Sequence, residues 1–224
     1  MTADFVAIVL AAGQGTRMKS ALPKVLHKLL GIPMYAHVVN ALLEAGIERS
    51  VVVVGHGRAA VEADVGARFG AGATTSGRSV VCALQERQLG TGDAVRAGLA
   101  AIPADYAGWV LVLCGDSPLL HAGLIRALLE AAKSERGPLV MLSSEVSDPT
   151  GYGRIVRDAG GRILRIREHK DASAEERAIR EVNPGVYAVR AAFLRSALAR
   201  LSTDNAQGEL YLTDVVEQVR ASCT

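Results

Sequence analysis

Short apolar runs alternate with longer amphipathic segments along the first two thirds of the chain. The apolar runs are nearly continuous and rich in β-branched residues, as in strands covered on both faces of a sheet; they span residues 5–10, 50–54, 79–84, 109–113 and 138–143. The amphipathic segments repeat apolar residues three and four positions apart, which predicts helices; they span residues 34–46, 58–69, 92–101 and 121–133. This alternation predicts an α/β fold with helices on both faces of a mostly parallel sheet.

After about residue 145 the apolar runs become shorter and more polar, at residues 153–157, 162–166 and 182–189. The Gly160-Gly161 pair between the first two runs predicts a hairpin turn. Helical patterns return at residues 190–201 and 210–220, and there is neither an internal repeat nor a low-complexity linker. We therefore predict a single domain over residues 1–224. Its parts are a large one at about 1–145, a small β-rich insertion at about 146–190 and C-terminal helices at about 190–221.

The composition excludes several classes of protein. With 224 residues, 50% of them hydrophobic and 21% charged, the chain is neither fibrous nor disordered. Its 25 Lys and Arg against 23 Asp and Glu leave a net charge of only +2, which argues against a nucleic-acid partner. The apolar stretch at residues 5–12 is too short to span a membrane and follows no basic segment, so we expect neither a membrane span nor a signal peptide. The three cysteines are odd in number and far apart, at Cys82, Cys114 and Cys223, which predicts no disulfide framework and a reducing, cytoplasmic location.

The candidate chemistry is concentrated just after the first predicted strand, within residues 6–26. Small residues and two glycines, Gly13 and Gly15, let a ligand approach the backbone closely and present N–H groups to phosphate oxygens. Arg17 and Lys24 follow them. An arginine can grip a phosphate with two hydrogen bonds, and a lysine acts as a compact charge. The segment therefore suits a nucleotide phosphate.

This turn matches neither of two common phosphate-binding patterns. A dinucleotide fingerprint, G-x-G-x-x-G, needs a glycine where this chain has Met18, and the P-loop pattern G-x-x-x-x-G-K-[ST] is absent. The two glycines could also do no more than shape a tight loop between a strand and a helix. The adjacent cations favour the phosphate site over that alternative.

The segment LAAGQGTRM at residues 10–18, followed by LPKVL, resembles the signature of the sugar-1-phosphate nucleotidyltransferases. Six later segments resemble, in the same order, the uridylyltransferase domain of the bifunctional N-acetylglucosamine-1-phosphate uridylyltransferase/glucosamine-1-phosphate acetyltransferases. They are QERQLGTGDAV, GDSPLL, DPTGYGRIV, REHKDAS, EVNPG and NAQGELYLTD, between residues 85 and 214. The resemblance runs from about residue 5 to about residue 220. It implies the nucleotide-diphospho-sugar transferase fold, a Rossmann-like three-layer α/β/α arrangement with a mostly parallel mixed sheet and a small β-rich sugar-binding insertion.

The resemblance also implies a reaction and its nucleotide site. UTP and N-acetylglucosamine 1-phosphate would give UDP-N-acetylglucosamine, a peptidoglycan precursor used in cell wall biogenesis, and pyrophosphate, by in-line attack on the α-phosphorus. Arg17, Lys24 and Asp116 would act in catalysis, with Asp116 as a ligand of Mg²⁺. The nucleotide-binding set would be Leu10, Ala12, Gly13, Gly15, Lys24, Gln85, Gly90 and Thr91, in which the last three read the uracil ring. Taken without the resemblance, Asp116 could be a turn residue before Pro118, and the Gly90-Thr91 pair could simply cap a helix.

For the sugar, the resemblance implies a pocket that includes Gly115, Gly153, Glu168, Asn183, Tyr211 and Thr213. Residue spacing alone would not reveal this set, and Glu168 could equally be a surface charge between Arg167 and Lys170. The chain departs from the family at Cys114, where tyrosine is frequent, and at Pro184, where Thr, Ser or Ala is usual. We expect Cys114 to be a small buried hydrophobe and not a nucleophile, since no histidine is placed to act as its base.

The chain ends at Thr224, before the asparagine that supplies a second metal ligand in the family and before the hexapeptide β-helix that carries acetyl transfer and trimer assembly. The expectation is therefore no left-handed β-helix domain, no acetyl transfer, and a monomer or weak oligomer. Two other functions stay open from the sequence. One is a related nucleotidyltransferase that uses another sugar phosphate or dTTP, and the other is a nucleotide-sugar-binding domain without turnover.

Overall fold

A computed structural model of the chain describes residues 5–15, 18–70 and 78–221. Its main element is a six-stranded sheet in the order β5-β4-β1-β6-β12-β7. The strands are β1 (Phe5–Leu10), β4 (Arg49–Val54), β5 (Ser79–Leu84), β6 (Trp109–Cys114), β7 (Leu139–Met141) and β12 (Tyr187–Arg190). Strand β12 runs antiparallel to both of its neighbours, and the pairs among β5, β4, β1 and β6 are parallel. The predicted mostly parallel, mixed sheet is confirmed.

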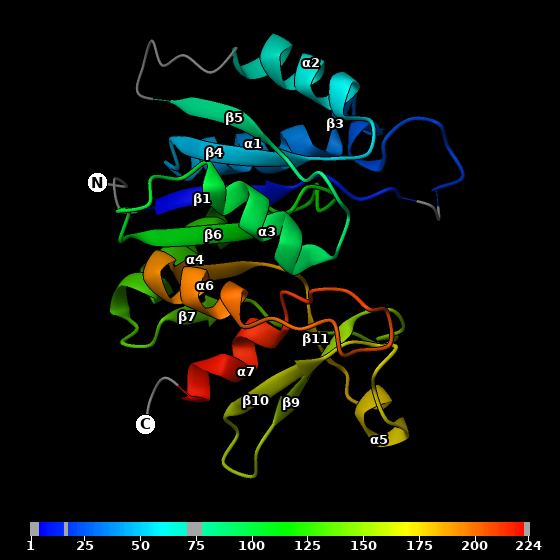
Figure 1. Cartoon of the computed structure of the whole chain (residues 1–224), viewed down its shortest axis with the longest axis vertical. Coiled ribbons are helices and arrows are strands. Elements are labelled where there is room, and N and C mark those ends of the chain that lie inside the picture. The colour runs from blue at the N-terminus through cyan, green and yellow to red at the C-terminus, as the bar shows by residue number, and fades with distance from the viewer. Residues whose placement is uncertain (1–4, 16–17, 71–77, 222–224) are drawn as a thin grey trace.

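Helices cover both faces of this sheet (Figure 1). One face packs against α1 (Met34–Glu44), α2 (Arg58–Phe69) and α4 (Ala122–Ser134), and the other against α3 (Thr91–Ala100), α6 (Ala191–Ala199) and α7 (Asp214–Ala221). Side chains from opposite faces of the same strands therefore enter two separate cores. This explains why the strands are nearly continuous in apolar residues.

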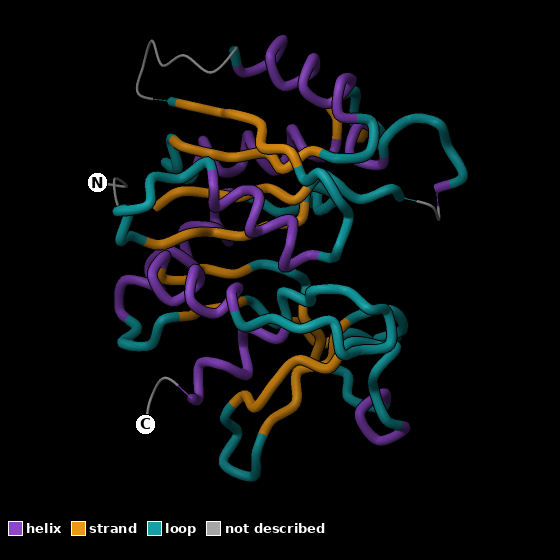
Figure 2. Tube along the Cα trace, in the orientation of Figure 1, coloured by secondary structure: helices purple, strands orange, loops and turns teal. Residues whose placement is uncertain are grey.

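A second, antiparallel sheet lies at one end of the large one and has the order β10-β9-β11-β8 (Figure 2). Its strands are β8 (Ser144–Glu145), β9 (Gly153–Arg157), β10 (Ile163–Arg167) and β11 (Glu181–Asn183), and the short helix α5 (Ala174–Arg177) precedes β11. Residues 153–157 form β9 as predicted, and a turn at 158–162 joins it to β10.

The single run predicted at residues 182–189 is wrong, because the structure divides it between the two sheets. Strand β11 ends at Asn183 in the small sheet, and β12 begins at Tyr187 in the large sheet. Pro184 has no N–H for a sheet ladder, and Gly185 adopts a positive φ of 77°. The Asn183 side-chain oxygen accepts a hydrogen bond from the Gly185 N–H at 3.0 Å, which fixes the turn.

The helix predicted at residues 210–220 begins later, at Asp214. Residues just before it lie along the start of α3, where the Leu210 N–H donates to the Leu89 carbonyl and the Leu210 carbonyl accepts from the Gly92 N–H, both at 2.7 Å. These long-range bonds use the backbone groups that a helix would have paired locally. The small hairpin of β2 (Lys28–Leu29) and β3 (Ile32–Pro33), and the 3-10 helix η2 (Lys24–Leu26), were not predicted.

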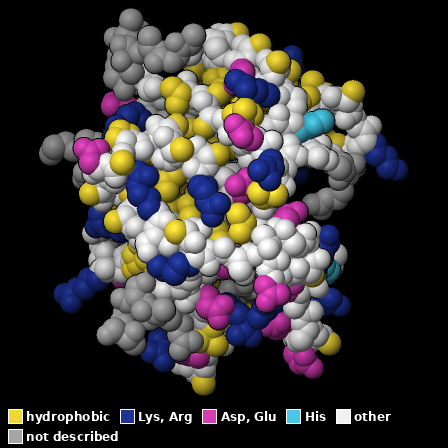
Figure 3. Space-filling view, in the orientation of Figure 1, with side chains coloured by type: hydrophobic (Ala, Val, Ile, Leu, Met, Phe, Trp, Pro, Cys, Tyr) yellow, Lys and Arg dark blue, Asp and Glu magenta, His cyan; other side chains and the backbone are white. Residues whose placement is uncertain are grey.

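Within the described part of the chain, no helix has the length and apolar content needed to cross a membrane. On the face drawn in Figure 3, Lys and Arg side chains are interspersed with Asp and Glu. This mixed surface agrees with the near-neutral composition.

Candidate active site

A cavity of about 670 Å³ opens at the carboxyl ends of β1, β5 and β6. Ligands bind at this edge of open α/β sheets because the loops that follow the strands meet there. The cavity lining includes nine residues predicted to bind the nucleotide or act in catalysis: Leu10, Ala12, Gly13, Gly15, Lys24, Gln85, Gly90, Thr91 and Asp116. Arg17, also predicted to act in catalysis, lies outside the described residues.

Backbone hydrogen bonds to adjacent segments fix the start of the loop after β1. The Leu10 carbonyl accepts from the Gly115 N–H at 2.8 Å, and the Ala12 carbonyl accepts from the His56 N–H at 3.2 Å. Gly15 has a φ of +59°, and a Cβ built on it would lie 2.6 Å from the Lys24 Cβ. Glycine is therefore needed at position 15 to let the lysine pack against the loop, whereas a Cβ on Gly13 would meet nothing within 4 Å.

Lys24 and Asp116 form an ion pair across the cavity, although they are 92 positions apart in the chain. Lys24 begins η2, and Asp116 follows the end of β6, the strand next to β1 in the sheet. Their side chains are 34% and 32% exposed, so both charged groups remain accessible to a ligand. A cation and a carboxylate at one point behind a glycine turn can hold a phosphate directly or through a divalent metal.

Among the described residues there is no cluster of three or more His, Cys, Asp or Glu that could hold a metal ion by itself. Asp116 places a single carboxylate in the cavity. Mg²⁺ is commonly bound by one or two carboxylates, with substrate phosphates and waters as its other ligands. The donor set present therefore fits Mg²⁺ when a nucleotide triphosphate supplies the remaining oxygens.

The turn from β5 to α3 forms another wall of the cavity. Gln85 is buried, and its Nε2 donates to the Gly90 carbonyl at 3.1 Å and to Asp93 Oδ2 at 2.9 Å. Thr91 Oγ1 accepts from the Leu212 N–H at 3.0 Å, and no side chain caps the start of α3. The Thr91 hydroxyl thus ties the 209–213 segment to this turn and does not cap the helix.

The residues predicted to bind the sugar do not line this cavity, but several of them lie together on and beside the small sheet. Thr213 Oγ1 donates to Glu168 Oε1 at 2.9 Å. A Cβ on Gly153 would lie 3.6 Å from the same Glu168 oxygen, and Gly153 pairs with Asn183 between β9 and β11. These four residues therefore converge, although they span residues 153–213.

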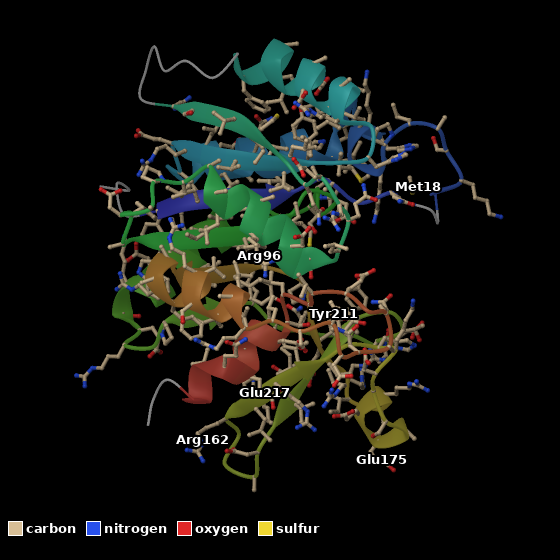
Figure 4. The ribbon with its side chains drawn as sticks, viewed as in Figure 1. Met18, Arg96, Arg162, Glu175, Tyr211 and Glu217 are labelled. Atoms are coloured by element: carbon tan, nitrogen blue, oxygen red, sulfur yellow. The ribbon has the colours of Figure 1, made fainter. Side chains whose placement is uncertain are left out.

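Tyr211 and Gly115, the other two predicted sugar-binding residues, have different surroundings. Tyr211 lies on the loop between α6 and α7 (Figure 4). Its hydroxyl donates to Asp171 Oδ2 at 3.2 Å and accepts from Gln207 Nε2 at 2.9 Å. Gly115 sits against the end of β1, where a Cβ would be 2.9 Å from the Leu10 carbonyl oxygen.

Cys114, one departure from the family pattern, contacts the residue that follows Pro184, the other departure. Cys114 lines the cavity, and its Sγ–H donates to the Gly185 carbonyl at 3.9 Å, one residue after Pro184. Burial, and then the charge of Asp116, raises the pKa of the Cys114 thiol to about 12. A thiol with this pKa is protonated at neutral pH, which agrees with the prediction that Cys114 is not a nucleophile.

Glu168 has an unusual electrostatic environment. Burial raises the pKa of its carboxyl above the ordinary value, and Asp214 and Asp171 contribute in the same direction, while the Thr213 bond opposes them. Burial also raises the pKa of Asp214, with Glu217 as the next cause. This acidic region would favour the neutral, hydroxyl-rich part of a ligand over an anionic group.

Three residues that line the cavity, and one that contacts the lining residue Gln85, were not predicted from the sequence. Gln14 Nε2 donates to Gln88 Oε1 at 2.8 Å, and Glu209 lines the cavity from the C-terminal segment. Asp93 contacts Gln85 from the first turn of α3. Gln14, Gln88, Asp93 and Glu209 all lie inside the motifs quoted above, but no periodicity marks them as facing the ligand.

Comparison with known proteins gives three findings. The model of the MobA-like NTP transferase domain matches residues 7–211. Proteins called "Bifunctional protein GlmU" from Sorangium cellulosum and Nocardia farcinica are 60% and 52% identical over 95% of this chain, which covers 44% and 43% of them. The structure of a UDP-glucose pyrophosphorylase complexed with UDP-glucose superposes with a TM-score of 0.77 at 18% identity, covering 96% of this chain and 86% of that one. The chain thus spans less than half the length of these curated relatives, and the structural match confirms the nucleotide-sugar transferase fold.

Proposed function

The chain belongs to the MobA-like NTP transferase domain family, and on that basis we propose that it forms UDP-N-acetylglucosamine and pyrophosphate from UTP and N-acetylglucosamine 1-phosphate. The observation that carries the proposal is the Lys24–Asp116 ion pair behind the Gly13–Gly15 loop, in one cavity with Gln85 and Gly90. In this arrangement one cavity would hold the phosphates at Lys24 and Asp116 and the base at Gln85 and Gly90. The motifs quoted above and the GlmU relatives support the choice of nucleotide and sugar.

In this proposal UTP lies along the cavity, with its base at Gln85 and Gly90 and its α-phosphate at Lys24 and Arg17. Asp116 would hold Mg²⁺, which when bound supplies positive charge beside the phosphates. The sugar phosphate, placed by Gly153, Glu168, Asn183 and their neighbours, attacks the α-phosphorus in line and displaces pyrophosphate. Its oxygen is already ionised, so alignment and charge neutralisation suffice and neither a covalent nucleophile nor a strong base is required.

The proposal divides the chain by role. Residues at about 1–145 bind the nucleotide, those at about 146–190 bind the sugar, and the C-terminal helices complete the fold. Strand β12 belongs to the large sheet although it falls within the second range. The free thiols of Cys82 and Cys114 fit a reducing compartment, and we place the reaction in the cytoplasm.

Pyrophosphate release from UTP, N-acetylglucosamine 1-phosphate and MgCl₂ tests the proposal, run beside a small panel of other sugar phosphates and dTTP. An enzyme of this kind releases pyrophosphate, whereas a nucleotide-sugar-binding domain shows only heat of binding. Replacing Lys24 by alanine should lower kcat about 10²–10³-fold, as for loss of one charge-stabilising donor. Lys28→Ala is the matched control, because Lys28 is exposed on β2 and does not line the cavity. Normal turnover by the Lys24 variant would refute the assignment.

A further inference from the structure

The side-chain amide of Gln85 has one orientation that its surroundings allow. Gln85 is 5% exposed, and its Nε2 lies 3.1 Å from the Gly90 carbonyl and 2.9 Å from Asp93 Oδ2. A carbonyl and a carboxylate accept hydrogen bonds and cannot donate them. If the amide were turned over, its oxygen would face two acceptors, so both N–H groups must point at Gly90 and Asp93.

This orientation leaves the Gln85 oxygen to a ligand. No donor among the described residues engages Gln85 Oε1, and Gln85 lines the cavity at the end where the base is expected. An unengaged acceptor in a buried wall favours a ligand that brings a donor, and penalises one that brings another acceptor.

We propose that Asp93 is a positioning residue that fixes Gln85 Oε1 as a hydrogen-bond acceptor for the base, and so makes the site select uracil or thymine over cytosine. Uracil and thymine carry an N–H at ring position 3, which can donate to Gln85 Oε1. Cytosine has a lone pair at the same position, which would face the glutamine oxygen without a hydrogen. The proposal rests on the proposed function for the placement of the base, and it adds the residue that sets base selectivity.

The position of Asp93 supports this role. It lies in the first turn of α3, where a carboxylate is stabilised by the unpaired N–H groups of the helix. It is eight residues from Gln85 and does not line the cavity, so it can hold the amide without contacting the ligand itself. The Gly90 carbonyl supplies the second restraint, and that restraint remains when Asp93 is changed.

The test compares kcat/KM for UTP and CTP in the wild type, Asp93→Asn and Asp93→Ala. The wild type should prefer UTP. Asparagine can offer Gln85 either a donor or an acceptor, and alanine offers neither, so in both variants only the Gly90 carbonyl still opposes the turned-over amide and that orientation becomes less costly. We expect the UTP:CTP preference to fall at least about tenfold, which corresponds to about 1.4 kcal/mol. Asp105→Asn, on an exposed turn, is the matched control and should keep the wild-type preference.

A purely structural role for Asp93 predicts a different outcome. Weakening of α3 would lower turnover with UTP and CTP alike and would lower Tm, without moving their ratio. An unchanged ratio in Asp93→Asn and Asp93→Ala proteins that remain folded would therefore overturn the proposal, as would equal use of UTP and CTP by the wild type.

Calorimetric binding of UDP and CDP separates this inference from the proposed function. If the wild type released no pyrophosphate yet bound UDP in preference to CDP, and Asp93→Ala lost that preference, the proposed function would fail and the role of Asp93 would stand. If UTP turnover were normal but both nucleotides bound equally to the wild type, the role of Asp93 would fail and the proposed function would stand.

Discussion

Replacing Gly98 by alanine should push helix α3 away from the large sheet. A Cβ built on Gly98 would lie 2.7 Å from Ile8 Cγ2 and 2.9 Å from Val53 Cγ2, closer than carbon atoms normally approach. These two side chains come from β1 and β4 and are fully buried, so neither can move into free space. The helix itself would have to shift.

The expected magnitude follows from two opposing effects. Alanine in place of glycine inside a helix stabilises by about 0.5–1 kcal/mol, whereas overpacking a dense core costs about 1–3 kcal/mol. Gly66 in α2 provides a matched control, because a Cβ there would meet nothing within 4 Å. Both variants gain helix propensity, so the difference between them measures the overpacking alone. We expect Gly98→Ala to be less stable than Gly66→Ala by about 1–3 kcal/mol.

Urea denaturation gives the unfolding free energy of both variants, and thermal unfolding should show about 2–4 °C in Tm for each 1 kcal/mol. Because α3 begins at Thr91, a displaced helix should also raise KM for UTP in the Gly98 variant and leave it unchanged in the Gly66 variant. Equal stability of the two proteins would refute the packing argument.

Two further predictions concern single sites. Glu168→Gln should raise Tm at pH 7. Burial is the chief cause that raises the folded-state pKa of Glu168. The contribution of Glu168 to stability is therefore full below the ordinary glutamate pKa and is lost as pH rises through the folded-state pKa, whereas glutamine stays neutral at every pH. The gain should shrink toward pH 4, and a gain that is independent of pH would contradict this reasoning. Gly15→Ala should lower both stability and turnover, because φ is +59° and the new Cβ would displace Lys24. Gly31→Ala, at φ +81° with free space around it, should lower stability alone, and comparable loss of turnover in both would count against the close approach at Gly15.

Much of the architecture could be predicted from local sequence. Residues 58–69 and 79–84 form α2 and β5 with the predicted bounds, because burial of one helix stripe and of both strand faces leaves a direct mark on residue order. The motifs that carry the family resemblance also marked nine residues that line one cavity, and their nucleotide-binding and catalytic roles stay predictions. The sugar-binding assignments stay predictions, although four of the residues concerned lie together.

Only the tertiary structure decided which distant groups meet. Local periodicity favoured one strand at 182–189 and a helix from residue 210, but pairing with separate sheets and with the 89–92 turn prevailed, because backbone bonds to distant segments leave no local pattern. The Lys24–Asp116 pair forms because β1 and β6 are neighbours in the sheet. The orientation of the Gln85 amide depends on its hydrogen bond to the Asp93 carboxylate. The sequence by itself thus determined the elements and the chemical groups of this protein, while the packing of its sheets determined which of those groups act together.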